Sequence, residues 1–213
     1  MQNKPSKQAG GSIPGRESEL PKKVRIIGGI WRSRLLSVMD VPGLRPSTDR
    51  IRETLFNWLG QDLTGLHCLD LFAGSGALGF EAASRRAHSV VLLEKDKRAA
   101  TNLQKNLTSL QSSPVPGLVT IRHQDSLDFL KQQASQVYNL IFIDPPFQDG
   151  ALLEKAVVQA GRICDDSAGG GIYVEFPSIR AREDVEAWLP DWHCGKYLEA
   201  GQVKACLFRR RRD

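Results

Sequence analysis

Between residues 66 and 146, short runs of consecutive apolar residues alternate with segments in which apolar residues recur every three or four positions. Consecutive apolar residues are typical of strands buried on both faces of a parallel sheet, and the wider spacing is typical of the helices that cover it. The alternation therefore predicts strand–helix units with right-handed connections. We expect strands at 66–72, 89–96, 118–125 and 138–146, and helices at 77–86, 97–110 and near 126–133.

The rest of the chain continues the same pattern to its end. It predicts a helix at 150–162, a strand at 171–176, a helix at 179–189 and two closing strands at 194–198 and 203–209. Because the link at 199–202 is too short for a crossover, the closing strands should pair antiparallel. The expected fold is α/β: a doubly wound, Rossmann-like, mostly parallel seven-stranded sheet with a final antiparallel strand.

A smaller unit precedes the sheet. Gly28 and Gly29 interrupt two strand-like pieces within 24–41, which predicts a β-hairpin. A helix should begin near Thr48 and Asp49 and end before Gly60. Residues 1–23 have too few apolar side chains to pack, so we divide the chain into a flexible tail (1–23), a basic hairpin and helix extension (24–60) and the sheet domain (61–213).

Composition narrows the class of protein. Hydrophobic residues make up 41% and charged residues 25% of the 213 residues, which is typical of an ordinary globular protein. Apolar runs such as 140–143 are far shorter than the roughly 20 residues that span a bilayer. The first residues form no apolar secretion signal, and we expect a cytoplasmic protein. The four cysteines and four histidines lack metal-ligand spacing, so we expect reduced thiols and no metal site.

Charge is distributed unevenly along the chain. Residues 1–60 hold 11 Lys and Arg against 5 Asp and Glu, a net charge of +6, and residues 204–213 hold 5 against 1, a net charge of +4. Basic segments flanking a mildly acidic body favour a polyanionic partner. The run Arg209–Arg212 can equally be a solubilising tail, whereas the arginines between 25 and 52 alternate with apolar positions that should be folded.

A glycine-rich segment joins the first predicted strand of the sheet to its helix. Gly74, Gly76 and Gly79 form the pattern GxGxxG after Asp70. Glycine lets the chain turn sharply and lets its backbone approach a ligand closely. The same spacing serves NAD, FAD and S-adenosylmethionine, and a tight turn without a ligand is the structural alternative.

Two acidic residues follow the next two strands of the predicted sheet. Glu94 lies 18 residues beyond Gly76, where a carboxylate can accept both hydroxyls of a ribose. Asp125 follows the third strand, where it can meet an adenine amino group or serve as a helix N-cap. These residues do not separate a dinucleotide from S-adenosylmethionine.

The segment Asp144-Pro145-Pro146-Phe147 ends the fourth predicted strand and resembles the signature of amino-methyltransferases. Its prolines remove two backbone donors, so that acceptors point into the cleft. Asp144 and the carbonyl of Pro145 can accept both hydrogens of an exocyclic amine, which favours a pyramidal nitrogen with its lone pair toward a methyl donor. Phe147 can stack on an extruded base. A strand-ending turn with a buried Phe147 is the alternative.

Together these motifs resemble the class I S-adenosylmethionine-dependent methyltransferases, and more narrowly the RsmD family of bacterial 16S ribosomal RNA guanine-N2 methyltransferases. The resemblance covers about residues 24–211 and rests on RIIGGIWRSR, RPSTDRIRETLFNWL, LDLFAGSGALGFEAASR, IFIDPPF and AGQV. It implies action on 16S ribosomal RNA in the small subunit or an assembly intermediate, and we expect a monomer.

The resemblance also implies site residues. The residues implied to bind the cofactor are Asp70, Phe72, Ala73, Gly74, Ser75, Gly76, Glu94, Lys95, Asp125, Ser126 and Thr48. The target amine would be held by Asp144, Pro145, Pro146 and Phe147. RNA phosphates would be contacted by Arg25, Arg32, Arg34, Arg45, Arg50, Arg52 and Lys204, and Arg45 can also close over the cofactor or substrate.

Other functions remain open at this point. An adenine-N6 methyltransferase acting on DNA or RNA, or a protein glutamine methyltransferase, would use related loops, although a protein substrate leaves the basic flanks unexplained. A dehydrogenase would share GxGxxG but would leave Asp144–Phe147 without a role. A non-catalytic ribosome assembly factor with a vestigial site is the alternative from a different class.

Overall fold

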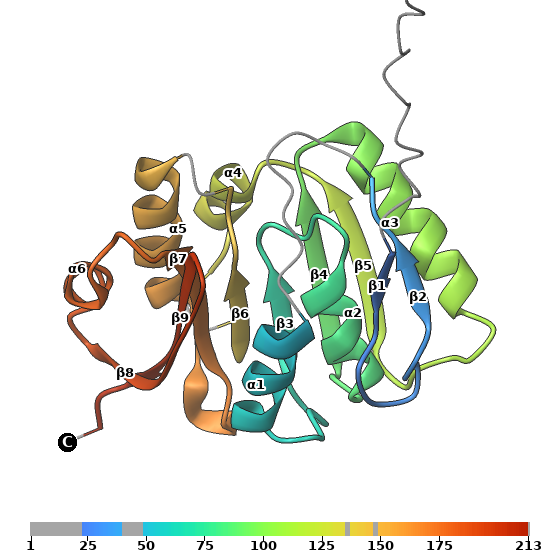
Figure 1. Cartoon of the computed structure of the whole chain (residues 1–213), viewed down its shortest axis with the longest axis horizontal. Helices are drawn as coiled ribbons and strands as arrows, with labels where there is room; N and C mark the ends of the chain where they lie inside the picture. The colour runs from blue at the N-terminus through green and yellow to red at the C-terminus, as the bar shows by residue number, and fades with distance from the viewer. Residues whose placement is uncertain (1–22, 40–48, 135–136, 147–148, 213) are drawn as a thin grey trace, which may run out of the picture.

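One sheet organises the residues that the computed structural model describes, which are 23–39, 49–134, 137–146 and 149–212. Its strands are β3 (His67–Asp70), β4 (Ser89–Glu94), β5 (Leu118–His123), β6 (Leu140–Ile143), β7 (Gly171–Pro177), β8 (Trp192–Ala200) and β9 (Val203–Arg210). They lie in the order β5-β4-β3-β6-β7-β9-β8 (Figure 1). The pairs from β5 to β7 are parallel, and the last strand, β9, is antiparallel to both of its neighbours. The predicted doubly wound fold is confirmed.

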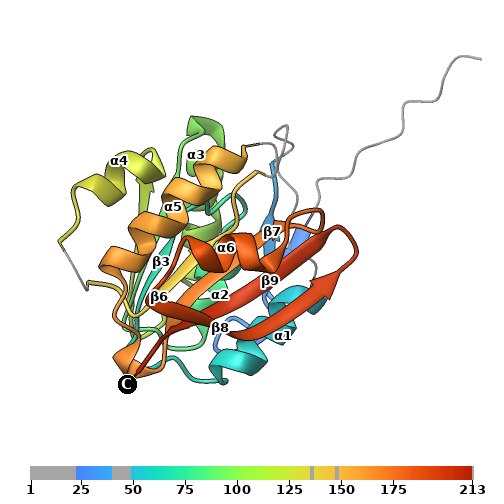
Figure 2. The same ribbon diagram turned by 90° about the vertical axis from the view of Figure 1, so that its left-hand side faces the viewer.

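Helices cover both faces of this sheet. They are α1 (Asp49–Leu59), α2 (Ala77–Ser84), α3 (Lys97–Leu110), α4 (Ser126–Lys131), α5 (Gly150–Ile163) and α6 (Arg182–Ala187), with a 3-10 turn at Asp166–Ala168. One buried core joins the first face to α1, α2 and α3. A second core joins the other face to α4, α5 and α6, which lie together in Figure 2. Continuous apolar strands such as β6 are therefore covered on both sides, as a parallel sheet requires.

The direction of winding reverses between β3 and β6. From β3 the chain proceeds outward through β4 to β5, and it then returns to place β6 on the other side of β3. At such a switch point the loops leaving the two strands diverge and open a crevice at the carboxyl edge. The glycine-rich loop follows β3 and the Asp-Pro-Pro segment follows β6, so the topology brings the two predicted motifs side by side at one edge of the sheet.

A two-stranded hairpin lies beside α3 (Figure 1), formed by β1 (Lys23–Arg25) and β2 (Leu35–Ser37). The hairpin is confirmed, but its strands are joined by nine residues rather than by a tight Gly28-Gly29 turn. The link is long because it docks on α2, where the buried Glu81 carboxylate accepts the backbone N–H groups of Ile27 and Gly28, both at 2.7 Å. Gly29 has φ +73°, and an added Cβ would collide with the carbonyl of Ser84.

The hairpin is also bonded to α3. The side-chain amides of Asn102 and Asn106, both buried, donate to the carbonyl of Ser37 at 2.7 and 3.0 Å, and Asn106 Oδ1 accepts the Ser37 N–H at 3.0 Å. Apolar residues of the hairpin link and of α1, including Trp31 and Phe56, belong to the same core as the sheet. The described part of the extension is therefore packed into the sheet domain, and its buried residues share their clusters with residues of that domain.

The predicted element boundaries need small corrections. Lys23, the last residue of the predicted tail, already belongs to β1, and residues 1–22 lie outside the described residues. The helix predicted at 77–86 ends at Ser84, and the helix predicted at 179–189 spans only Arg182–Ala187. The latter starts late because residues 177–180 form a turn, in which the Arg180 N–H donates to the Pro177 carbonyl at 3.0 Å. None of the helices described is long and apolar enough to cross a membrane.

Candidate active site

The glycine-rich loop turns the chain sharply from β3 into α2. Gly74 and Gly76 have φ values of +50° and +82°. A Cβ on Gly76 would collide with the ring of Phe80 and approach Leu103 to 2.8 Å. Backbone conformation and close packing both require glycine at position 76, which explains the residue type independently of any ligand.

Asp70 ends β3 behind this loop and is almost fully buried. Its Oδ2 accepts the N–H of Gly79 in α2 at 3.1 Å, so the carboxylate ties the strand to the helix that follows it. The pKa of Asp70 is raised to about 7, chiefly by burial. The backbone hydrogen bonds from Gly79 and Phe72 lower it, and the charges of Glu94 and Glu175 raise it. Asp70 therefore titrates near neutral pH.

Glu94 ends β4 and is partly exposed at the same edge. Its Oε2 accepts the N–H of Gly74 at 3.0 Å, and its Oε1 accepts the N–H of Asp96 at 2.8 Å. A carboxylate has about four acceptor positions, so both oxygens retain capacity for a further donor. Glu94 thus holds the glycine-rich loop and can accept hydroxyl groups from a ligand beside it.

Asp125 has a structural role at the next strand. Its carboxylate caps α4, accepting the N–H groups of Leu127 at 2.9 Å and Asp128 at 3.3 Å, and forms a salt bridge with Lys95 at 3.0 Å. The hydroxyl of Ser126, which is buried, donates to the carbonyl of Leu71 behind the glycine-rich loop. The N-cap alternative for Asp125 is confirmed, and a contact with adenine stays a prediction.

The Asp-Pro-Pro segment leaves the end of β6. Asp144 is partly buried, Pro145 is buried and Pro146 is exposed, whereas Phe147 lies outside the described residues. In the adjacent strand β7 the buried Tyr173 hydroxyl donates to Oε1 of the buried Glu175 at 2.8 Å. Burial raises the pKa of Tyr173 well above its usual value, and the charges of Glu175 and Asp144 act in the same direction. Tyr173 therefore remains a hydrogen-bond donor beside the segment.

Glu175 was not identified from the sequence. An acidic residue within the otherwise apolar strand GIYVEF was a signal, because a charge on a doubly covered strand is costly unless it serves the carboxyl edge. Glu175 lies on the same edge as Asp70 and contributes to its raised pKa. This edge of the sheet consequently holds one more acidic residue than the sequence predicted.

The predicted RNA-contacting residues fall into different environments. Arg25, Arg32 and Arg50 are exposed. Arg34 is partly buried and donates to the carbonyl of Ser109 at 2.6 Å, near the end of α3. Lys204 is partly buried, and its Nζ donates to the carbonyl of Arg180 at 3.2 Å. Arg45 and the predicted cofactor residue Thr48 lie outside the described residues.

The prediction that Arg52 contacts RNA is wrong, because this side chain is buried. Its side chain is 0% exposed, and it forms salt bridges with Asp49 and, at 3.8 Å, with Glu81. Arg85 binds the other side of the same carboxylate at 2.8 Å. The Arg52–Glu81–Arg85 cluster fastens α1 to α2 and to the hairpin link, so Arg52 is a structural cation and not part of an RNA surface. Glu81 itself was missed, although it is the one charged residue within the segment ALGFEAAS.

Metal binding and thiol chemistry depend on the His, Cys, Asp and Glu residues of the described ranges. They contain no group of three or more His, Cys, Asp or Glu that could hold a metal ion. The four cysteines are free thiols, and Cys68, Cys164 and Cys206 are buried. Burial raises the pKa of Cys68 and Cys164, so these two thiols are unreactive filler of the core.

A seven-stranded sheet of this order, with a glycine-rich loop and an Asp-Pro-Pro segment on the two sides of its switch point, defines a class I methyltransferase. Residues 24–209 match the family model described as Conserved hypothetical protein 95. The chain belongs to that family, the RsmD family.

Individual relatives agree with this assignment. Ribosomal RNA small subunit methyltransferase D of Escherichia coli K12 is 42% identical over 194 residues, covering 88% of this chain and 90% of that protein. Its namesake in Haemophilus influenzae is 45% identical over 170 residues, covering 78% and 85%. The solved structure of yhhF from Escherichia coli is 39% identical with a TM-score of 0.73, covering 90% of this chain and 100% of that chain.

Proposed function

We propose that this methyltransferase transfers a methyl group from S-adenosylmethionine to the exocyclic N2 amine of a guanine in 16S ribosomal RNA of the small subunit. The observation that carries the proposal is the position of Asp144 and Pro145, across the switch point from the glycine-rich loop. An amine acceptor and a cofactor loop on two sides of one crevice suit transfer between two bound molecules.

The residues at the carboxyl edge fit S-adenosylmethionine. The glycine-rich loop allows close approach of its backbone, and Glu94 beside it keeps acceptor capacity for ribose hydroxyls. Glu94 and Glu175 make the edge acidic, and Asp70 adds negative charge as it ionises near neutral pH, which complements a cationic ligand. When bound, S-adenosylmethionine supplies an electrophilic methyl group on a positively charged sulfur. The solved structure of SMU.776 with bound SAH shares the fold at 14% identity and a TM-score of 0.67.

The chain's own groups would then act on the amine. The Asp144 carboxylate and the Pro145 carbonyl accept hydrogen bonds from its two N–H groups, which turns the nitrogen lone pair toward the methyl group. As the new N–C bond forms and the S–C bond breaks, the nitrogen releases one proton to the Asp144 carboxylate or to water. Tyr173 and Glu175 form a buried pair in the strand beside Asp144 and limit the freedom of this part of the site. Positioning and electrostatics suffice for the reaction, and no covalent intermediate on the protein is required.

The choice of RNA rests on charge and on the relatives. Arg25, Arg32 and Arg50 present exposed cations outside the crevice, which suit phosphate groups. Relatives covered over 85% to 90% of their length carry the name ribosomal RNA small subunit methyltransferase D. Guanine N2 as the target atom follows from resemblance to that family.

The test is transfer of a labelled methyl group from S-adenosylmethionine to small ribosomal subunits from cells that lack this protein. Free ribosomal RNA and duplex DNA are assayed in parallel. Label recovered as N2-methylguanine at a single site supports the proposal, and the ratio between subunits and free RNA identifies the recognised form. Label on adenine or on protein overturns the substrate, and cofactor binding without any transfer favours an assembly factor.

A further inference from the structure

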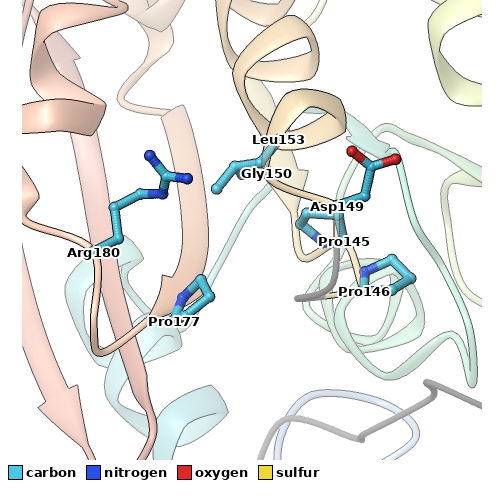
Figure 3. A pocket seen from close by; sticks show the side chains of 7 residues that line it. All are labelled: Pro145, Pro146, Asp149, Gly150, Leu153, Pro177 and Arg180. Carbon is cyan, nitrogen blue, oxygen red and sulfur yellow. The ribbon is translucent and has the colours of Figure 1, made fainter.

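A pocket lies between the Asp-Pro-Pro segment that follows β6 and the turn that follows β7 (Figure 3). In the strand order β7 and β3, which the glycine-rich loop follows, lie on opposite sides of β6. The pocket is an open depression rather than an enclosed cavity, and its empty space of about 240 Å³ includes open solvent. Its lining residues are Pro145, Pro146, Asp149, Gly150, Leu153, Pro177 and Arg180. Three proline rings and one leucine make the walls largely apolar, and Arg180 supplies the cation.

Arg180 is held in place but not neutralised. Its guanidinium lies 5.1 Å from the ring centre of Trp188, and within the described part of the chain it forms no salt bridge. Lys204 fixes the backbone at this point by donating to the Arg180 carbonyl at 3.2 Å. Stacking on a ring leaves the N–H groups at the edge of the guanidinium available, in a geometry that suits a phosphate.

Access and local charge both suit an RNA strand. Ile179, which precedes Arg180 in the turn, is 95% exposed, so this turn faces solvent. The Asp149 carboxylate is occupied as the N-cap of α5, where it accepts the Leu152 N–H at 2.9 Å. Figure 3 shows that carboxylate on the opposite side of the pocket from Arg180 and directed away from it. The guanidinium is thus the cation that meets a ligand entering between them.

We propose that this pocket binds the nucleotide adjoining the target guanine, with Arg180 paired to its phosphate and the proline rings against its sugar or base. The inference rests on the proposed function. The lining begins at Pro145, immediately after Asp144, so a strand whose target amine is held at Asp144 places a covalently joined neighbour beside Arg180. A nucleotide in a single strand has a phosphate beside its sugar and base. The pocket has a cation for the phosphate beside apolar rings for the sugar or base.

The experiment measures binding of the full-length protein to its RNA substrate across a salt series. Arg180→Gln should weaken RNA binding by about tenfold at low salt, because a charge-assisted hydrogen bond is lost. The slope of log K against log salt should fall by about 0.7, which is the loss of one phosphate contact to single-stranded RNA. Affinity for S-adenosylmethionine, measured by calorimetry, should not change.

Two further variants make the result specific. Arg180→Lys keeps the charge and should keep the slope while losing part of the affinity. Arg162→Gln removes an exposed arginine from the far end of α5, about 18 Å along the helix from Gly150, and should change neither quantity.

The outcomes separate this inference from the proposed function. An unchanged slope in Arg180→Gln overturns the pocket assignment even if the wild-type protein methylates RNA. A wild-type protein that transfers no methyl group to RNA overturns the proposed function and the pocket assignment with it. Equal losses of slope in Arg162→Gln and Arg180→Gln also overturn the assignment, because they indicate diffuse attraction rather than a phosphate site.

Discussion

Glu94 at the end of β4 holds Gly74 of the glycine-rich loop, its Oε2 accepting the Gly74 N–H at 3.0 Å. The two residues are 20 positions apart: Glu94 ends β4, and Gly74 lies in the loop that follows the adjacent strand β3. One carboxylate therefore sets the position of the loop and offers acceptors at the place where a ribose would lie. A substitution of Glu94 should consequently alter both the position of the glycine-rich loop and the affinity for the cofactor.

Replacing Glu94 by alanine should lower the affinity for S-adenosylmethionine by about 10- to 100-fold. Hydrogen bonds to a charged group contribute about 1.5 to 3 kcal/mol, and the loop also loses its support. Calorimetric titration measures this loss, and RNA binding in a filter assay serves as the control. Equal losses of cofactor and RNA affinity would indicate misfolding instead.

Replacing Asp144 by alanine should reduce the single-turnover rate of methyl transfer by about 100- to 1,000-fold, as for loss of a preorganised electrostatic contact. RNA affinity should stay within about twofold, because exposed cations outside the crevice supply most of it. Asp144→Asn keeps one acceptor and should be less impaired. A rate near that of the wild-type protein in Asp144→Ala would remove this residue from the reaction.

Stability should depend on pH through Asp70. Its pKa is about 7 in the folded protein, raised chiefly by burial, and about 3.9 in an unfolded chain. Between these values the folded state binds more protons, so the Asp70 contribution to the free energy of unfolding falls as pH rises from about 4 to about 7 and is level above that.

The variant Asp70→Asn isolates this contribution. The difference in free energy of unfolding, variant minus wild type, should increase between pH 4 and pH 7 and then stay constant. Urea denaturation at several pH values measures it. A difference that does not change with pH would show that Asp70 is ionised in the folded protein throughout this range.

Gly29→Ala should destabilise the protein more than Gly60→Ala. Both glycines have positive φ, +73° and +93°, so both substitutions introduce backbone strain. At Gly29 the new methyl group also collides with the Ser84 carbonyl, whereas at Gly60 no heavy atom lies within 4 Å. We expect about 1 kcal/mol for Gly60→Ala and at least about 2 kcal/mol more for Gly29→Ala, measured by thermal and urea denaturation. Equal losses would mean that the hairpin link does not rest against α2.

Arg32 and Arg52 should behave differently although both precede the sheet in an arginine-rich segment. Arg32→Ala removes an exposed cation, and should weaken RNA binding and reduce its salt slope without changing stability. Arg52→Ala leaves Glu81 with one partner fewer in a buried cluster, and should lower the free energy of unfolding by about 3 to 5 kcal/mol. A salt slope unaltered by Arg32→Ala would exclude this side chain from the RNA interface.

The alternation of strands and helices was available from the sequence because it depends on local periodicity. Apolar runs such as 140–143 and the helical spacing at 97–110 each report burial of their own segment. The glycine-rich loop and Asp144–Phe147 are each a short continuous stretch of sequence. Their residue types alone therefore indicated a cofactor loop and an amine-binding segment. Parallel winding then placed both motifs at one edge, since the ends of parallel strands meet there.

Tertiary structure decided the roles of the charged and polar side chains. Arg52 is indistinguishable from Arg32 in the sequence pattern, but α2 brings Glu81 to it and excludes water from both. Asn102 and Asn106 became partners of Ser37 only when the hairpin docked on α3.

Arg180 and Pro145 likewise line one pocket only in the folded chain. Arg180 lies in a turn at a position where the sequence predicted a helix. A sequence pattern records which face of an element is apolar. Whether a charged side chain is buried in an ion pair or exposed depends on which distant residue lies next to it. Only the folded chain determines that pairing.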